Sequence, residues 1–267
     1  MASRSWLSAN ESRLQEQTCG AFAVIERPAR ARLLVENFCA TRRAAEELRQ
    51  LFGGAIVPLS PDWEAEAFAA TRVKPIRIGS RLVVASDAAD VDASENVLIV
   101  PAGAAFGTGG HTTTAMSLRM LERVTRRLQS GWRMLDAGTG SGILALVGRR
   151  FGAGVVAIDN DPLAISTAEA NALRNHLQGI NFMVADVKRK PRGTFDIITA
   201  NLYSELLIEV LPLWRSALRR EGRLILSGVM RTQEADVVKA LGANSYDVEE
   251  TRRRGKWIAL RCSQKRS

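Results

Sequence analysis

A strand that runs directly into a glycine-rich turn and a helix, at residues 134–143, constrains the fold more than any other feature of this sequence. The segment reads Met-Leu-Asp-Ala-Gly-Thr-Gly-Ser-Gly-Ile. Its glycines permit a tight turn and a close approach of the backbone to a ligand. From residue 132 onward, apolar strand patterns alternate with helical patterns. This alternation predicts right-handed crossovers and a mainly parallel sheet in a doubly wound α/β fold.

The C-terminal half can be divided into individual elements. Strands are expected at residues 133–137, 155–159, 180–185, 195–201 and 223–227, and helices at 143–151, 162–176, 204–218 and 232–241. Two further apolar runs, at 246–250 and 257–262, flank Arg254-Gly255. They predict a closing hairpin with an antiparallel strand.

The sequence predicts three zones: a small α+β domain at residues 1–60, a connector at 61–95 and a catalytic domain at 96–267. In the first zone we expect strands at 31–36 and 55–59 and a helix at 41–52. A strand at 21–26 and disorder of the first twenty residues are left open. The connector predicts a short helix opening at 61, strands at 76–78, 81–86 and 96–100, and then a helix to about 128.

Two acids accompany the glycine-rich turn. Asp159 ends the next strand, about 20 residues after Gly138, where a ribose-binding acid is expected. Asp136 precedes the turn, and position 143, where a dinucleotide fingerprint has its third glycine, is Ile143. A carboxylate at 136 would repel a pyrophosphate but would attract a ligand that carries an ammonium and a sulfonium. The charge therefore favours S-adenosylmethionine over a dinucleotide.

This segment resembles the first motif of the class I methyltransferases, whose sheet has seven strands. The resemblance implies S-adenosylmethionine as cofactor, with Asp159 on the ribose, Asp186 near the adenine, and the glycine-rich backbone against the methionine and ribose. The implied cofactor-binding residues in this segment are Asp136, Gly138, Gly140, Gly142, Asp159 and Asp186. For Asp186 a plain helix cap at the end of a strand is an equally good interpretation.

A second glycine-rich stretch, residues 104–114, precedes the strand-turn-helix unit. Glycines and threonines around Phe106 and His111 make a poor core but a good ligand-covering loop, with hydroxyl donors and a stacking surface. A cap of the following helix by His111 or Thr112 is the alternative.

The stretch resembles the loop of the PrmA family of ribosomal-protein methyltransferases, through Gly103, residues 105–109, His111 and residues 113–114. Trp63 and residues 74–79 also resemble that family, so the resemblance covers 61–263. It adds Phe106, Gly107 and Thr108 to the expected cofactor-binding set, and Thr108 and His111 to the expected catalytic set.

Two departures from the family pattern bear on the substrate. Pro101-Ala102 stands where the family has Asp-Pro, and Thr112 replaces its proline. The family also carries a ferredoxin-like β-α-β-β-α-β domain that grips the ribosomal protein, whereas residues 20–60 supply about half of one. The N-terminal unit is therefore expected to be a reduced recognition domain.

Asn201 is expected at the carboxyl end of the fourth strand, where ligands of open α/β sheets bind. Residues 200–203 resemble the family's Ala-Asn-Ile-Leu, which is related to the Asn-Pro-Pro-Tyr motif of amine methyltransferases. An amide oxygen there can accept a hydrogen bond from a neutral amine. We therefore expect Asn201 to be catalytic and to lie beside the cofactor, with a plain strand-end turn as the alternative.

These features predict methyl transfer to a lysine or α-amine nitrogen of a protein, with a ribosomal protein as the expected partner. Methylation of RNA or of a small amine, and a non-catalytic binding module, are the alternatives. The net charge of +9 favours anionic surroundings and leaves RNA contact open. The three cysteines and two histidines lack the spacing of a metal or disulfide framework. No metal, no membrane segment, no export signal, a cytoplasmic location and a monomer are expected.

Overall fold

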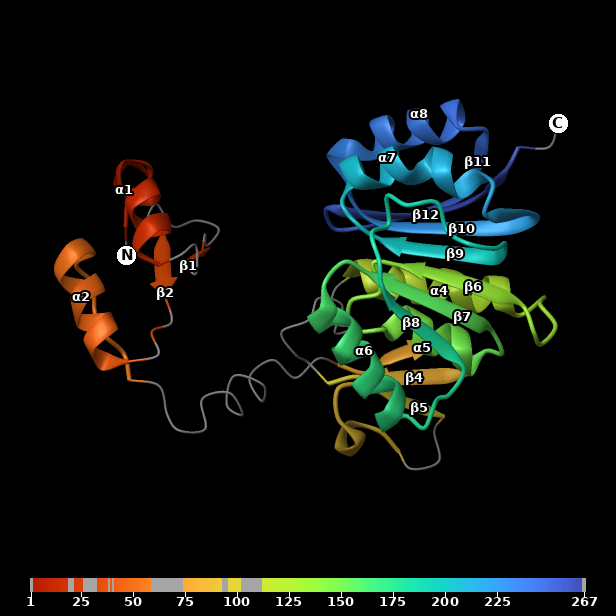
Figure 1. Cartoon of the computed structure of the whole chain (residues 1–267), viewed down its shortest axis with the longest axis horizontal. Helices are drawn as coiled ribbons and strands as arrows, with labels where there is room; N and C mark the ends of the chain where they lie inside the picture. Colours follow the sequence, from red (N-terminus) through yellow and green to blue (C-terminus); the bar gives the residue numbers. More distant parts are fainter. Residues whose placement is uncertain are drawn as a thin grey trace. The chain divides into compact units, whose positions relative to one another are not determined.

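The computed structural model describes residues 2–18, 22–25, 33–37, 39, 41–58, 74–92, 96–101 and 112–265. The chain forms two compact units, Met1–Ala67 and Phe68–Ser267, each with its own secondary structure (Figure 1). No helix in these described stretches is long and apolar enough to span a membrane. The zone boundaries expected near residues 60 and 95 stay predictions.

The first unit contains two helices and a two-stranded antiparallel sheet. Its elements are α1 (Arg4–Gln17), β1 (Phe22–Ile25), β2 (Leu34–Asn37) and α2 (Arg42–Phe52). The Thr41 hydroxyl caps α2 by accepting a hydrogen bond from the Ala44 amide at 3.2 Å. Gly53, with φ of 74°, ends that helix. The helix expected at 41–52 is confirmed, and β1 lies within the strand left open at 21–26.

The structure answers one question that the sequence left open for this unit and corrects one expectation. Residues 4–17 form the helix α1 and are not disordered. Only Leu14 of this polar helix is buried, so the sequence shows no apolar stripe from which the helix could be predicted. The signal that was overlooked is the N-cap, because the Ser3 hydroxyl accepts a hydrogen bond from the Trp6 amide. Residues 55–58 form no strand, and Val57 is 74% exposed, as expected of an extended segment without a neighbouring strand.

The second unit begins with a three-stranded sheet of β3 (Ile76–Ile78), β4 (Leu82–Ala85) and β5 (Val97–Ile99). β3 and β4 are antiparallel and β4 and β5 are parallel, in the segments where strands were expected. Asn175 binds β5 as a neighbouring strand would: its Oδ1 accepts from the Ile99 amide and its Nδ2 donates to the Ile99 carbonyl, both at 2.7 Å. The small sheet is therefore held against the larger fold.

The main sheet has seven strands in the order β11-β12-β10-β9-β6-β7-β8, and β12 is antiparallel to its neighbours (Figure 1). The strands are β6 (Arg133–Ala137), β7 (Gly154–Asp159), β8 (Ile180–Val184), β9 (Phe195–Asn201), β10 (Leu218–Met230), β11 (Tyr246–Arg254) and β12 (Trp257–Gln264). The helices are α4 (Thr112–Thr125), α5 (Ile143–Arg150), α6 (Pro162–Arg174), α7 (Ser204–Arg215) and α8 (Glu234–Ala243). The predicted fold class and closing hairpin are confirmed.

Helices cover both faces of this sheet because successive strand residues point to opposite sides. Met134 packs into a core with residues of α4 and α5, whereas the next residue, Leu135, packs into a core with residues of α7 and α8. The chain leaves β6 through α5 to β7 on one side, while β9 lies on the other side of β6. The carboxyl ends of β6 and β9 thus form the switch point at which open α/β sheets bind ligands.

β10 is longer than predicted, and one crossover contains no helix. β10 begins at Leu218 instead of residue 223, because Leu218 already pairs with Phe195 of β9. The residues between 218 and 223 are polar, so the apolar strand pattern in the sequence starts only after them. The crossover from β8 to β9, residues 185–194, contains no helix. The α7 side of the sheet near β8 is therefore crossed only by a loop.

Candidate functional site

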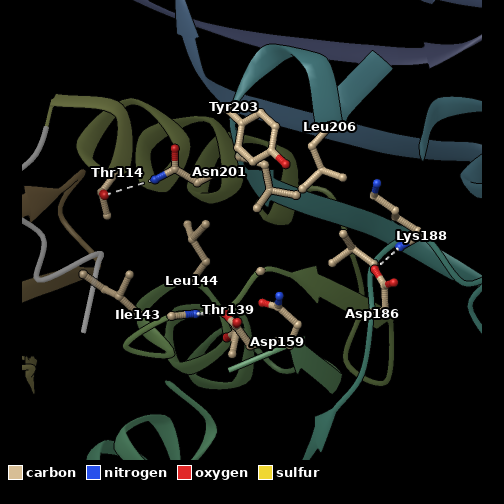
Figure 2. Close-up of a pocket in the computed structure, with 15 residues that line it drawn as sticks. Thr114, Thr139, Ile143, Leu144, Asp159, Asp186, Lys188, Asn201, Tyr203 and Leu206 are labelled. Carbon is tan, nitrogen blue, oxygen red and sulfur yellow. Dashed lines mark hydrogen bonds between the residues drawn. The ribbon is translucent and has the colours of Figure 1, made fainter. Parts of the chain in front are cut away.

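A cavity of about 420 Å³ lies at the carboxyl ends of the parallel strands, within the size range of small-molecule sites. Segments that follow β6, β7, β8 and β9 all line it, as Figure 2 shows with Asp159 and Thr139 on one side, Asn201 and Tyr203 on another, and Asp186 and Lys188 on a third. The predicted residues that it brings together are Gly138, Gly140, Asp159, Asp186 and Asn201.

The glycine-rich turn after β6 is fixed to the end of β7. The amides of Gly138 and Thr139 both donate to the Ile158 carbonyl at 2.9 Å. Gly138 and Gly140 have φ of 73° and 54°, in the left-handed region that favours glycine. A Cβ at Gly138 would meet the Cδ2 atom of Leu202 at 2.5 Å. The backbone therefore stays bare where it faces the cavity.

Asp159 connects this turn to the start of α6. Its Oδ2 accepts from the Gly140 amide at 2.9 Å, and its Oδ1 accepts from the Asp161 amide at 3.1 Å. Each carboxylate oxygen has a second lone pair, and the residue lines the cavity. The carboxylate can thus accept further hydrogen bonds from two neighbouring hydroxyls of a ligand.

Asp136 does not line the cavity, which corrects the direct ligand contact expected of it. Its side chain is 1% exposed and accepts from the hydroxyls of Thr199 at 2.6 Å and Thr139 at 2.7 Å. Burial raises the pKa of Asp136 to about 6, against the opposing effect of these hydrogen bonds. The residue holds Thr139, and with it the turn, in place.

The Asp136→Asn variant should be more stable than the native chain above pH 6. A carboxyl whose pKa is raised on folding destabilises the folded state as pH rises from its unfolded value of 3.8 through about 6. This rise of the pKa on folding corresponds to roughly 3 kcal/mol. Urea unfolding at pH 4 and pH 7.5 should give matching free energies at pH 4 and a gain of up to that size at pH 7.5. A difference independent of pH would contradict the assigned burial cost.

Gly142 is a packing residue and not part of the cavity wall, which corrects its predicted role. It is the N-cap of α5 with φ of 81°, and a Cβ there would lie 2.8 Å from the Cβ of Ala168 on α6. The absence of a side chain lets α5 begin against α6, and this sets the direction in which the turn leaves β6.

Gly142→Ala should lower the free energy of unfolding by roughly 2 to 5 kcal/mol, the sum of a left-handed backbone conformation and an overpacked contact. Gly242→Ala is the matched control, because Gly242 lies within α8 and nothing stands within 4 Å of its added Cβ. Alanine there should stabilise by up to about 1 kcal/mol. Equal thermal stability of the two variants would rule out this packing role.

Asn201 ends β9 with its side-chain amide oriented by α4. Its Nδ2 donates to the Thr114 hydroxyl at 3.4 Å (Figure 2). Its Oδ1 is buried and accepts no hydrogen bond from any residue that the structure describes. An unpaired buried acceptor costs about 1 to 3 kcal/mol, so such groups are rare and call for an explanation. A donor supplied by a ligand is the simplest one.

Asp186 lies on the cavity wall beyond β8. Its Oδ1 accepts from the Lys188 amide at 2.9 Å, which makes it a turn cap as well as a cavity residue. The Lys188 ammonium pairs with Glu209 of α7 at 2.8 Å, and this hydrogen bond raises the lysine pKa. Because that cation is already paired, the local charge of the cavity is set by Asp159 and Asp186.

Four predicted site residues, Phe106, Gly107, Thr108 and His111, lie outside the described residues, and their roles stay predictions. Sequence reasoning missed Thr114 and Thr139, although both stand inside motifs that it identified. It also missed lining residues whose position depends on packing alone; these are Ile143, Leu144, Asn160, Val187, Leu202 and Leu206. Among the described residues, no three His, Cys, Asp or Glu side chains gather as a metal site would require.

Comparison with known proteins identifies the family. Residues 55–265 match the model of the protein family described as "Ribosomal protein L11 methyltransferase (PrmA)". A ribosomal protein L11 methyltransferase of Pelotomaculum thermopropionicum is 40% identical over 191 residues, 70% of this chain and 61% of the relative. That of Symbiobacterium thermophilum is 35% identical over 222 residues, 80% of this chain and 72% of the relative.

The fold comparison agrees. The crystal structure of a ribosomal protein L11 methylase from Lactobacillus delbrueckii subsp. bulgaricus matches with a TM-score of 0.65 and 31% identity, and the match covers 72% of this chain and 99% of that one. The matches to two of the similar sequences span only 61% and 64% of those relatives' lengths. The family match over residues 55–265 and the sequence identity lead to one conclusion: the chain belongs to the ribosomal protein L11 methyltransferase (PrmA) family.

Proposed function

We propose that this chain transfers methyl groups from S-adenosylmethionine to amine nitrogens of a ribosomal protein. The observation that carries the proposal is that Asn201, whose Oδ1 accepts no hydrogen bond from a described residue, lines the same cavity as the glycine turn and Asp159. A cradle for a nucleoside and an acceptor for an amine hydrogen thus share one space. The names of the relatives support ribosomal protein L11 as the substrate.

The cavity suits a positively charged nucleoside. Asp159 is placed to accept hydrogen bonds from ribose hydroxyls, while the turn at Gly138 has no side chain and packs against Leu202, which also lines the cavity. The carboxylates of Asp159 and Asp186 would repel a pyrophosphate and attract a cation. The ammonium of Lys188 does not offset them, because it is paired with Glu209. When bound, S-adenosylmethionine would supply a methyl group on a sulfonium that acts as its own leaving group.

Asn201 would handle the acceptor. Its Oδ1 can accept a hydrogen bond from a neutral amine and so direct the nitrogen lone pair, while Thr114 holds the other end of the amide. A lysine must first lose its proton, and its ordinary pKa is about 10.4. Burial near a positive charge lowers the pKa of the lysine, so orientation and desolvation of the amine can supply most of the rate enhancement. Thr108 and His111 are the candidates for moving the proton.

The N-terminal unit would contribute substrate recognition. We assign residues 1–60 this role because the family's recognition domain precedes its catalytic domain and because this unit has a compact fold of its own. The proposal places the chain in the cytoplasm, where ribosomal proteins are made, and as a monomer.

Mass spectrometry of purified ribosomal protein L11 incubated with this chain and S-adenosylmethionine tests the proposal. Mass increments of about 14 Da per methyl group on lysine or on the N-terminal amine are expected, and nuclease treatment of the acceptor should not remove them. Methyl groups that appear instead in added RNA or in a small amine would overturn the protein substrate while keeping the chemistry. Binding of S-adenosylmethionine without any transfer would indicate a non-catalytic module.

A further inference from the structure

The loop that connects β8 to β9 carries a run of cations that the proposed methyl transfer does not use. Residues 188–192 read Lys-Arg-Lys-Pro-Arg. Lys188 lines the cavity and pairs with Glu209. Arg189, Lys190 and Arg192 are exposed, and none of them forms an ion pair with a described residue.

A cation from another element extends this run. The side chain of Arg133, at the start of β6, lies beside Gly193, with its guanidinium nitrogens 3.3 Å from the position of an added Cβ there. Its guanidinium carbon stands 5.3 Å from the centre of the Phe195 ring and has no carboxylate partner among the described residues. Arg133, Arg189, Lys190 and Arg192 together form what we call the basic strip.

The basic strip follows the sheet from one end to the other. The loop leaves the cavity at Asp186, beside the carboxyl end of β8, and reaches the amino end of β9 at Phe195. Five-residue β8, which runs alongside, is about 17 Å long at 3.3 Å per residue.

Nearby acids do not neutralise the strip. Asp186 caps the turn at Lys188, Glu209 pairs with Lys188, and Asp196 pairs with Arg219 at 2.9 Å. Some arginines of the neighbouring strands β10 and β11 are paired with carboxylates, for example Arg223 with Glu249 and Arg253 with Glu234. The cations of the basic strip therefore keep their positive charge beside the cavity.

We propose that the basic strip is an RNA-binding surface that contacts phosphates beside the entrance of the cavity. Guanidinium groups bind phosphate oxygens in a bidentate manner, and the strip is of one sign throughout. Residues 188–192 offer no apolar side chain except Pro191, whereas protein interfaces usually have an apolar centre. The net charge of +9 adds long-range attraction. This binding does not depend on methyl transfer.

Fluorescence anisotropy with a labelled single-stranded RNA of about 20 nucleotides tests the proposal on the full chain, across roughly 50 to 200 mM salt. The triple variant Arg189→Gln, Lys190→Gln and Arg192→Gln should bind about 10- to 100-fold more weakly. Its slope of log affinity against log salt should be shallower by about 2, because each phosphate contact on a single strand contributes about 0.7.

The matched control removes three positive charges elsewhere, with Arg127→Gln, Arg231→Gln and Arg254→Gln. These arginines are exposed, lie after α4, after β10 and in the β11–β12 hairpin, and form no ion pair with a described residue. The control should change affinity by less than about 3-fold. Equal losses in both triple variants, or no binding of the RNA by the native chain, would overturn the proposal. Displacement of the RNA by polyglutamate at equal charge would assign the strip to an acidic protein instead.

Discussion

Replacing Asn201 with alanine is expected to lower turnover about 100- to 1,000-fold while the dissociation constant for S-adenosylmethionine changes by less than a few fold. The magnitude is that of removing one preorganised hydrogen-bonding group that acts on the reacting atoms. Binding of the cofactor should survive because the carboxylates and the glycine turn on the other walls of the cavity are left intact. Single-turnover kinetics with ribosomal protein L11, together with calorimetric titration, measure the two quantities.

The stability of this variant separates a functional from a structural role. The change removes the Nδ2 hydrogen bond to Thr114, worth about 0.5 to 1.5 kcal/mol, but it also removes a buried oxygen that has no partner among the described residues and so costs a similar amount. The free energy of unfolding should therefore change little. A large loss of stability would instead identify Asn201 as a structural residue at the end of a strand.

Asn160→Ala is the control for this experiment, since Asn160 is also an asparagine that lines the cavity but follows Asp159 and not β9. It should leave the rate constant of the chemical step near the native value. Equal losses of that rate constant in the two variants, or native turnover in Asn201→Ala, would remove Asn201 from the mechanism.

The cradle could be predicted from the sequence because its parts obey local rules. Glycines at 138 and 140 follow an apolar strand, and Asp159 ends the next strand of a parallel sheet, so both must reach the same edge. The hydrogen bond from the Gly140 amide to Asp159 is the direct consequence. Asn201 reaches that edge for the same reason, since β9 lies beside β6.

The direction of each side chain could not be predicted in the same way. Asp136 lies two residues before Gly138, yet it is buried against Thr199 of the neighbouring strand and does not line the cavity. Gly142 continues the glycine pattern, but its contact is Ala168, a residue of a helix that only the tertiary fold brings near. A motif gives the order of residues along the chain, whereas the orientation and packing of each side chain depend on elements that are remote in sequence.

The N-terminal helix could not be predicted from hydrophobic periodicity. α1 exposes most of its residues, so its hydrophobic periodicity is weak and only the Ser3 cap signals it. The crossover at 185–194 is short and polar, and its composition does not indicate which part of the sheet it crosses. The consequence for the basic strip appears only when Arg133 and Gly193 are found side by side.

Replacing Asp159 with alanine is expected to raise the dissociation constant for S-adenosylmethionine about 30- to 1,000-fold. A hydrogen bond to a charged group is worth about 1.5 to 3 kcal/mol, and two hydroxyls of the ribose are within the capacity of this carboxylate. The variant also frees the amide of Gly140, which loosens the turn that the cofactor would bind. Isothermal calorimetry of the purified chain measures the change.

Asp161→Ala is the matched control for this prediction, because it removes a carboxylate two residues away that does not line the cavity. The Asp161 side chain caps α6 by accepting from the Leu163 amide at 2.9 Å, so its loss should cost about 1 kcal/mol of stability and leave the dissociation constant unchanged. If Asp159→Ala binds the cofactor as tightly as the native chain, the ribose contact is wrong. If both variants weaken binding equally, the effect comes from the general loss of negative charge near α6 and not from the hydrogen bonds of Asp159.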